Sequence, residues 1–311
     1  METRTLANPP SILPLYARAA APMVPGASLL PFFPGRGKEI PEIELELPGV
    51  RPDPEKVAAY ARVCGFALRD LLPPTYPMVL AFPLHMAVMA DGSFPFGAIG
   101  LVHVENRIEQ RRPIGLDEEL TLRVRPTKLK PHPKGQTFSL LTKVLSGRRI
   151  AWESTSTMLH RGKPGAGTDA DGPKSADIER FSARRPPEGW PVGAEWRLAG
   201  DLGRRYAAVS GDRNPIHMHA LTAKPLGFPR AIAHGMWTKA RCLAALEPRL
   251  PDAFGVEVRF RKPILLPARV EFANEGSGDE IDFEVRDAKR GTPHLEGHVA
   301  PLEDKTKDGR K

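Results

Sequence analysis

Cysteine is scarce in this 311-residue sequence, which contains only Cys64 and Cys242. Two cysteines far apart cannot supply the disulfide framework that stabilises many small secreted domains. Both lie in segments with the apolar spacing of helices, so we interpret them as small buried residues. The scarcity of cysteine fits a reducing compartment, and we expect the protein to be cytoplasmic.

Long apolar runs are also missing. Seven prolines interrupt the apolar stretches of the N-terminal segment, between Pro9 and Pro34. A membrane-spanning helix needs roughly 20 consecutive apolar residues, and a signal peptide needs a charged start followed by an unbroken apolar stretch. Neither pattern is present, so we expect no membrane insertion and no signal peptide.

The charge balance is basic, with a formal net charge of +8. Such an excess suggests nucleic-acid binding as one hypothesis. However, much of the excess lies in short pairs such as Arg111-Arg112, and neither a nucleic-acid module nor an aromatic stacking platform accompanies it. A basic surface would serve a phosphate-bearing small molecule or an acidic partner protein equally well, so nucleic acid is not an expected partner.

The length of the chain is typical of two domains of ordinary size or of one large domain, and its composition is typical of a globular protein. Residues 1–38 are rich in Pro and Ala, and we expect an extended arm with a short helix near residues 15–20; its role is not apparent from the sequence. A Gly- and Pro-rich linker is expected at 161–189, and a polar tail at 303–311. Helices are expected at 54–64, 78–89, 201–209 and 235–247, and strands at 40–47, 98–109, 120–126, 136–146, 149–159, 194–197, 255–261, 268–274, 281–287 and 294–299.

The parts 39–160 and 190–302 repeat one another. The run from Tyr60 to Gly65 (Tyr-Ala-Arg-Val-Cys-Gly) corresponds to the run from Tyr206 to Gly211 (Tyr-Ala-Ala-Val-Ser-Gly). Further along, Arg-Arg-Pro-Ile at 111–114 corresponds to Arg-Lys-Pro-Ile at 261–264. The repeat predicts two α+β units, each an antiparallel sheet wrapped round a central helix. We expect the two sheets to join edge to edge into one continuous sheet, because this would cover exposed edges.

The richest chemistry lies between residues 206 and 236. Asp212 and His217 stand five positions apart around a turn marked by Gly211 and Asn214-Pro215. Imidazole exchanges protons near neutral pH, and a nearby carboxylate orients it or shares a water with it. On spacing alone, the alternative is that the two are a helix cap and a surface ring.

Gly235 falls in the first turn of the helix that follows His234. The first N–H groups of a helix have no partner within it, and together with the helix dipole they favour an oxyanion. Glycine also lets a substrate carbonyl approach closely, because it has no Cβ. This stretch therefore combines an acid–base pair with an oxyanion donor.

The run Tyr-Ala-x-x-Ser-Gly-Asp-x-Asn-Pro-Ile-His, followed by Gly227-Phe228 and by Ile-Ala-His-Gly-Met at 232–236, resembles the MaoC-like family over about thirty positions. The family comprises (R)-specific enoyl-CoA hydratases, or 3-hydroxyacyl-thioester dehydratases, with hotdog folds. The whole chain is similar to the double-hotdog members, in which one half keeps the site. The resemblance implies that Asp212 and His217 are the catalytic pair and that the Gly235 N–H is the oxyanion donor. It also implies supporting roles for Ser210, Asn214 and His234. No metal and no cofactor are implied.

The activity implied by the resemblance is the reversible hydration of trans-2-enoyl thioesters to (3R)-3-hydroxyacyl thioesters in fatty-acid metabolism. The substrate would be a thioester of CoA or of acyl-carrier protein, handled by a monomeric double hotdog or a homodimer. Two alternatives on the same fold are a thioesterase and a non-catalytic acyl-thioester-binding protein. A metal cluster of His217, His219 and His234 is a further alternative, but we expect His219 to begin a helix and face solvent.

The two copies differ where the chemistry is expected. Continuing the register of the repeat puts Phe66 at the position of Asp212, Leu71 at that of His217, and Ala-Phe-Pro at 81–83 near that of Ala-His-Gly at 233–235. We therefore expect one active site per chain, in the second copy. The apolar residues of the first copy would supply a wall of the acyl tunnel: Phe82, Met86, Met89, Phe94 and Phe96. The alternative for each of them is that it is an ordinary core residue.

Overall fold

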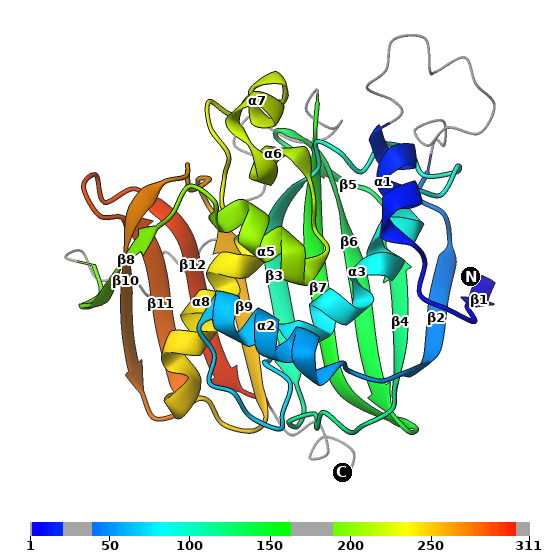
Figure 1. The fold of residues 1–311 in the computed structure, drawn as a ribbon, viewed down its shortest axis with the longest axis horizontal. Helices are drawn as coiled ribbons and strands as arrows, with labels where there is room; N and C mark the ends of the chain where they lie inside the picture. The colour runs from blue at the N-terminus through cyan, green and yellow to red at the C-terminus, as the bar shows by residue number, and fades with distance from the viewer. Residues whose placement is uncertain (1, 21–38, 163–188, 303–311) are drawn as a thin grey trace, which may run out of the picture.

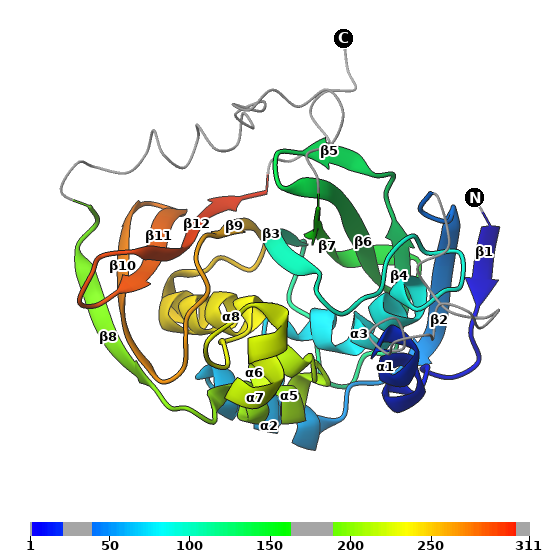
Figure 2. The ribbon, with the colours of Figure 1, turned by 90° about the horizontal axis from the view of Figure 1, so that it is seen from above.

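The computed structural model describes residues 2–20, 39–162 and 189–302. Within these residues twelve strands form a single sheet, which curves around the longer helices (Figure 1). Seen from above, the sheet is an arch with the helices on its concave side (Figure 2). Most of the expected linker and the polar tail lie outside the described residues.

The first unit wraps its part of the sheet around helix α3, Tyr76–Met89, with α2, Pro54–Cys64, beside it (Figure 1). Alternate residues of β4 are buried, because successive side chains of a strand point to opposite faces. Helix α3 is apolar around almost its whole circumference, as expected of a helix enclosed by a sheet. The strands, in their order across the sheet, are β2 (Ile43–Val50), β4 (Leu120–Pro126), β6 (Gly135–Ser146), β7 (Arg149–Arg161) and β3 (Val102–Gln110), with β5 (Lys130–His132) paired to β6.

The second unit has the same plan around helix α8, Gly235–Leu246, with α5, Leu202–Ser210, beside it. Its strands, from the outer edge inwards, are β8 (Val192–Leu198), β10 (Ala268–Ser277), β11 (Glu280–Asp287), β12 (Pro293–Pro301) and β9 (Phe254–Phe260). Short helical turns lie between α5 and α8 and after α8: α6 (Pro215–Met218), α7 (Ala220–Ala223), η3 (Lys224–Leu226) and η4 (Glu247–Arg249).

The two units meet where β3 pairs with β9 in antiparallel register, from Glu105 opposite Arg259 to Gln110 opposite Phe254. The strand order on one side of this seam repeats on the other, so the expected continuous sheet is confirmed. Lys239 of α8 reaches the seam, where its buried Nζ donates to the Asn106 side-chain oxygen at 2.6 Å and to the carbonyl oxygens of Asn106 and Val256.

The N-terminal arm contains the short helix that the sequence predicts near residues 15–20, and also a strand that the sequence does not predict. Strand β1, Glu2–Thr5, adds to the sheet edge in parallel with β2, and helix α1, Ile12–Ala20, packs against α3 (Figure 1). The local pattern of a four-residue strand does not indicate its partner, because the pairing joins residues about forty positions apart.

The predicted register between the copies is wrong after Gly65. Leu71 forms an isolated bridge with Gly115, as Ile232 does with Leu265, so Leu71 corresponds to Ile232 rather than to His217. Likewise, the N–H of Leu72 bonds to the Ile114 carbonyl as the N–H of Ala233 bonds to that of Ile264. The second copy has a longer segment here, which carries α6, α7 and η3.

The longer segment of the second copy also shifts the start of its central helix relative to the predicted register. Helix α3 begins at Tyr76, so the Ala-Phe-Pro run at 81–83 lies within it and Pro83 is an interior residue. The run therefore does not correspond to the start of α8. Residue-by-residue counting failed because it allowed no insertion between the copies. Phe66 does follow Gly65 as Asp212 follows Gly211, and both glycines end their helices in the left-handed conformation.

Cys64 and Cys242 are buried in α2 and α8, which confirms their interpretation as small interior residues. In the described part of the chain, no helix has both the length and the apolar character needed to cross a bilayer.

Candidate active site

The turn after α5 fixes the Asp212 carboxylate. Gly211 ends α5 with φ 77°, and the Asp212 N–H donates to Ser210 Oγ at 3.2 Å. Asp212 Oδ1 accepts from the Asn214 N–H at 3.1 Å, while Asn214 Oδ1 accepts from the Ile216 N–H at the start of α6. Ser210 and Asn214 thus hold the backbone around Asp212.

His217 lies in α6 with its ring oriented by the main chain. Its Nδ1 donates to the Ile232 carbonyl oxygen at 2.8 Å. A carbonyl oxygen only accepts, so Nδ1 carries the proton and Nε2 of the neutral ring has a free lone pair. His217 is 8% exposed, which leaves its ring largely shielded from solvent.

Gly203, in α5, supports His217 in a way that we did not foresee from the sequence. A Cβ on Gly203 would lie 2.0 Å from the His217 carbonyl oxygen and 3.0 Å from its carbonyl carbon. Helix α5 and the His217 backbone can therefore approach this closely only with glycine at 203. The signal in the sequence is the isolated glycine inside a predicted helix, a position where glycine can serve packing.

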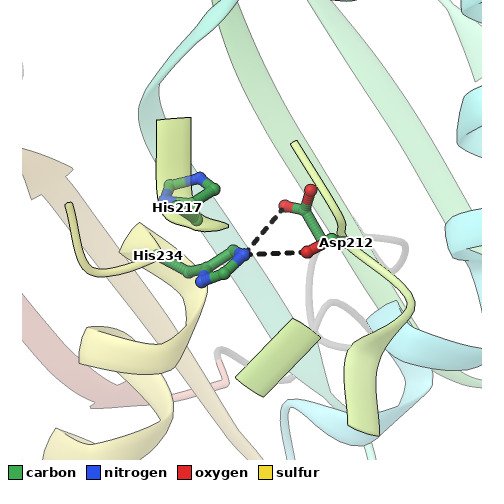
Figure 3. A group of neighbouring side chains, drawn as sticks. All are labelled: Asp212, His217 and His234. Carbon is green, nitrogen blue, oxygen red and sulfur yellow. Dashed lines mark hydrogen bonds and ion pairs between the residues drawn. The ribbon is translucent and has the colours of Figure 1, made fainter. Parts of the chain in front are cut away.

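His234 lies against both members of the pair (Figure 3). Its Nε2 donates to the Asp212 carbonyl oxygen at 3.0 Å and lies 3.8 Å from Asp212 Oδ2. Its ring stacks on that of His217, with centroids 3.6 Å apart and planes 23° from parallel. The structure thus brings the three predicted residues together from α6 and two connecting segments.

A tyrosine from the opposite end of the chain completes the surroundings of the carboxylate. The Tyr16 hydroxyl of α1 donates to Asp212 Oδ1 at 3.1 Å and accepts from the Arg213 N–H at 2.6 Å. No local sequence signal connects Tyr16 with Asp212, because they are separated by 196 positions.

The surroundings keep Asp212 ionised. Burial raises the pKa of its carboxyl, but the positive charge that His234 and His217 carry when they are protonated in acid opposes this effect. The hydrogen bonds from the Asn214 N–H and the Tyr16 hydroxyl act in the same direction as the imidazoles. The resulting pKa of Asp212 lies below its ordinary value.

The two imidazoles are neutral at neutral pH. Burial lowers the pKa of His217, against the opposing effects of the Asp212 charge and the bond to the Ile232 carbonyl. Burial and the proximity of His217 lower the pKa of His234 to about 3. The site therefore presents one carboxylate and a neutral His217 with a free Nε2, which is the state needed to accept a proton.

The carboxylate and the two imidazoles are also side chains that can bind a metal ion. The potential ligand atoms of Asp212, His217 and His234 all lie within 4.8 Å of one another. However, imidazole lone pairs lie in the ring plane, and two stacked, nearly parallel rings do not direct them to one point. His219 is outside the group: it is exposed and caps α7, as predicted from the sequence. The arrangement suits proton transfer better than chelation.

Gly235 begins α8, so its N–H is at the helix N-terminus, and the residue lines the cavity next to His234. A Cβ on Gly235 would lie 2.9 Å from the ring of Phe260, which also lines the cavity. The absence of a Cβ at Gly235 thus makes room for the Phe260 ring beside the helix start.

The cavity has a volume of about 230 Å³ and is lined by residues of both units. Phe82 and Met89 of α3 line it together with Met78 and Val79. Three other residues that we predicted for its wall are buried in the hydrophobic core and do not line it: Met86, Phe94 and Phe96. Phe94 and Phe96 follow α3 and pack on Phe138 instead, so an apolar character alone did not separate core from cavity wall.

Three histidines of the cavity wall are not among the predicted site residues: His85, His103 and His294. His103 of β3 lines the cavity, and its Nε2 is buried without a hydrogen-bond partner in the described residues. Burial and the nearby Lys239 lower the pKa of His103 to about 4, so its ring is neutral. Three basic side chains also line the cavity: Arg161, Arg261 and Lys262.

Fold and site together define a class: a double hotdog protein in which a carboxylate and two imidazoles lie beside a helix N-terminus. Residues 194–297 match the family described as MaoC like domain. Over 294 residues the chain is 38% identical to 3-hydroxyacyl-thioester dehydratase X of Mycobacterium tuberculosis, covering 94% of this chain and 99% of that protein.

Comparison with solved structures supports the same family and fold. A crystal structure of HtdX from M. tuberculosis has a TM-score of 0.72 at 37% identity, covering 83% of this chain and all of that one. A second M. tuberculosis protein, described as a double hotdog, has a TM-score of 0.50 at 15% identity, over 82% of this chain and 93% of that one, a likeness of fold. The chain belongs to the MaoC-like dehydratase family, a family of hydro-lyases.

Proposed function

We propose that the protein catalyses the reversible hydration of trans-2-enoyl thioesters to (3R)-3-hydroxyacyl thioesters, with Asp212 and His217 as the acid–base pair. The observation that carries this proposal is the juxtaposition of an ionised carboxylate with a neutral imidazole. A carboxylate oxygen of Asp212 and a ring nitrogen of His217 lie within 4.8 Å of each other, a separation that one water bridges with two hydrogen bonds of about 2.8 Å. The name of the 38%-identical relative supports the same reaction.

In the hydration direction, Asp212 and His217 Nε2 hold the water. As its oxygen bonds to C3 of the enoyl group, one of its protons passes to the pair, and the C2–C3 π electrons move towards the thioester oxygen. The pair then returns a proton to C2 from the same side, so the net addition is one H and one OH. Dehydration is the reverse.

The thioester oxygen gains negative charge when the enolate forms. In this proposal the Gly235 N–H donates to that oxygen, because Gly235 begins α8 and lines the cavity. One donor of this kind contributes about 3 kcal/mol to the transition state in a shielded site. The thioester itself acidifies the C2 proton, so the mechanism needs no cofactor.

The cavity wall suggests how the substrate lies. Met78, Val79, Phe82 and Met89 form an apolar surface for the acyl chain. The basic side chains that also line the cavity would meet the phosphate of a phosphopantetheine arm, which CoA and acyl-carrier protein share.

The test is the hydration of crotonyl-CoA and of a longer trans-2-enoyl-CoA, followed by loss of the conjugated-thioester absorbance. Asp212→Asn and His217→Ala are expected to lower kcat by at least about a hundredfold, since acid–base groups contribute at this scale. His219→Ala is the matched control, because it removes an exposed imidazole two positions away and should keep the wild-type rate. The product should be the (3R) alcohol.

Other outcomes separate the alternatives. If CoA esters are inert but carrier-protein thioesters are hydrated, the carrier is decided and the reaction stands. Release of free thiol, without loss of the double bond, would identify a thioesterase. Binding of enoyl thioesters with no turnover would identify a binding protein.

A further inference from the structure

Helix α1 brings one polar atom to the reacting carboxylate. The residues Ile12, Leu15 and Tyr16 share one face of α1, and all three are partly buried. Leu15 and Tyr16 pack against the hydrophobic core, whereas Leu13 on another face is 72% exposed. The helix thus lies on the protein through a defined surface, at the edge of which the Tyr16 hydroxyl contacts Asp212.

The fit between α1 and the Asp212 turn is close. A Cβ on Gly211 would lie 2.9 Å from Ile12 Cδ1, so glycine at this position lets α1 approach the turn. The Tyr16 hydroxyl makes two hydrogen bonds there, one to the carboxylate and one from the Arg213 N–H. Asp212 and Arg213 both belong to the turn after α5. A phenylalanine at position 16 would keep the aromatic ring but lose both hydrogen bonds.

The two oxygens of the Asp212 carboxylate have different surroundings. Oδ1 accepts from the Tyr16 hydroxyl and from the Asn214 N–H, both at 3.1 Å. Oδ2 instead lies 3.8 Å from His234 Nε2, beyond a normal hydrogen bond. Two donors on one oxygen restrict rotation about the Cβ–Cγ bond and leave the other oxygen available.

We propose that Tyr16 is a positioning residue for the hydration reaction: its hydroxyl fixes Oδ1 of Asp212 so that Oδ2 is presented to the reacting water. This inference rests on the proposed function. It assigns a role to the N-terminal helix, which contributes to the site of the second unit from across 196 positions.

The hydroxyl remains a donor in this arrangement. Burial raises the pKa of Tyr16, and the charge of Asp212 raises it further, so Tyr16 is protonated over the working range of the enzyme. Removal of a donor to the charged carboxylate disfavours that form, so the pKa of Asp212 should rise. The other titratable or charged groups around Asp212 are unchanged by a substitution at Tyr16: His103, Tyr206, Arg213, His217 and His234.

Tyr16→Phe in the full-length chain tests the proposal, because it keeps the ring and deletes the hydroxyl. We expect kcat to fall about tenfold, the scale of one hydrogen bond to a charged group, with KM changed less than about twofold. The acidic limb of the kcat/KM pH profile should move to higher pH. Tyr76→Phe is the matched control, since Tyr76 is a buried tyrosine that does not line the cavity, and it should keep the wild-type kcat and profile.

A second readout does not depend on turnover. The side-chain carboxyls of aspartate are labelled with ¹³C, and the Asp212 signal is identified by its loss in Asp212→Asn. Its titration midpoint should move to higher pH in Tyr16→Phe and stay unchanged in Tyr76→Phe.

The outcomes are distinguishable. If wild type hydrates enoyl thioesters and Tyr16→Phe matches its kcat, the positioning role is refuted while the proposed function stands. If wild type is inert on every thioester but the Asp212 midpoint still moves in Tyr16→Phe, the control of Asp212 by Tyr16 stands and the hydration reaction falls. An unmoved midpoint refutes the proposal in either case and reduces Tyr16 to an anchor for α1.

Discussion

Replacement of Gly203 by alanine adds a single methyl group outside the cavity, yet it should disable the site. The new Cβ would lie 2.0 Å from the His217 carbonyl oxygen, about 1.4 Å inside an ordinary contact of 3.4 Å. The obstructing atom is backbone, so it cannot yield by a side-chain rotation. The contact can be relieved only if α5 and α6 separate by about 1 Å, which moves the His217 ring.

Stability and activity should respond differently. Alanine in a helix interior is favoured over glycine by up to about 1 kcal/mol, whereas overpacking costs about 1–3 kcal/mol. We therefore expect Gly203→Ala to lower the free energy of unfolding by about 1 kcal/mol. A displacement of about 1 Å at a reacting group lowers the rate about a hundredfold, so kcat should fall far more than the folded population does.

The assay is enoyl-thioester hydration together with urea unfolding of the same preparation. Gly200→Ala is the matched control, because its Cβ would meet only Pro267 Cδ at an ordinary 3.8 Å; it should keep wild-type kcat. The reasoning is refuted if Gly203→Ala is more stable than wild type, as its helix propensity alone predicts, or if it is fully active.

Three further predictions follow from other contacts. Gly235→Ala should lower stability by about 1 kcal/mol and raise KM, because its Cβ would push the Phe260 ring into the cavity; Phe260→Leu should restore both, and additive effects would contradict this. Burial holds the pKa of Lys239 well below its unfolded value, so the unfolded chain binds the extra proton and the contribution of Lys239 to stability should rise with pH up to about 10. Lys239→Met should lack this rise in urea unfolding at successive pH values, and a parallel pH dependence would exclude the mechanism. Dialysis against EDTA should leave kcat unchanged, because the stacked rings of His217 and His234 do not converge on one point; a loss restored by a divalent ion would indicate a metal centre.

Local sequence determined the elements and the repeat. The alternation in β4, the cap and proline at the start of α2 and the apolar length of α3 each depend on neighbouring residues, which periodicity detects. Around the Gly-Asp-x-Asn-Pro turn, Asp212 is likewise fixed relative to Ser210 and to Asn214 by hydrogen bonds between residues two positions apart. These features could be predicted because the interactions that produce them are local.

Tertiary structure alone decided which distant groups meet. Tyr16 reaches Asp212, and Gly203 meets the His217 carbonyl, because helices pack in space and not in sequence order. The same reason explains why Met86 lies in the core while Phe82 lines the cavity, although both are apolar residues of one helix. An apolar pattern specifies that a side chain leaves water, but only the packed neighbours determine whether it borders a cavity or another side chain.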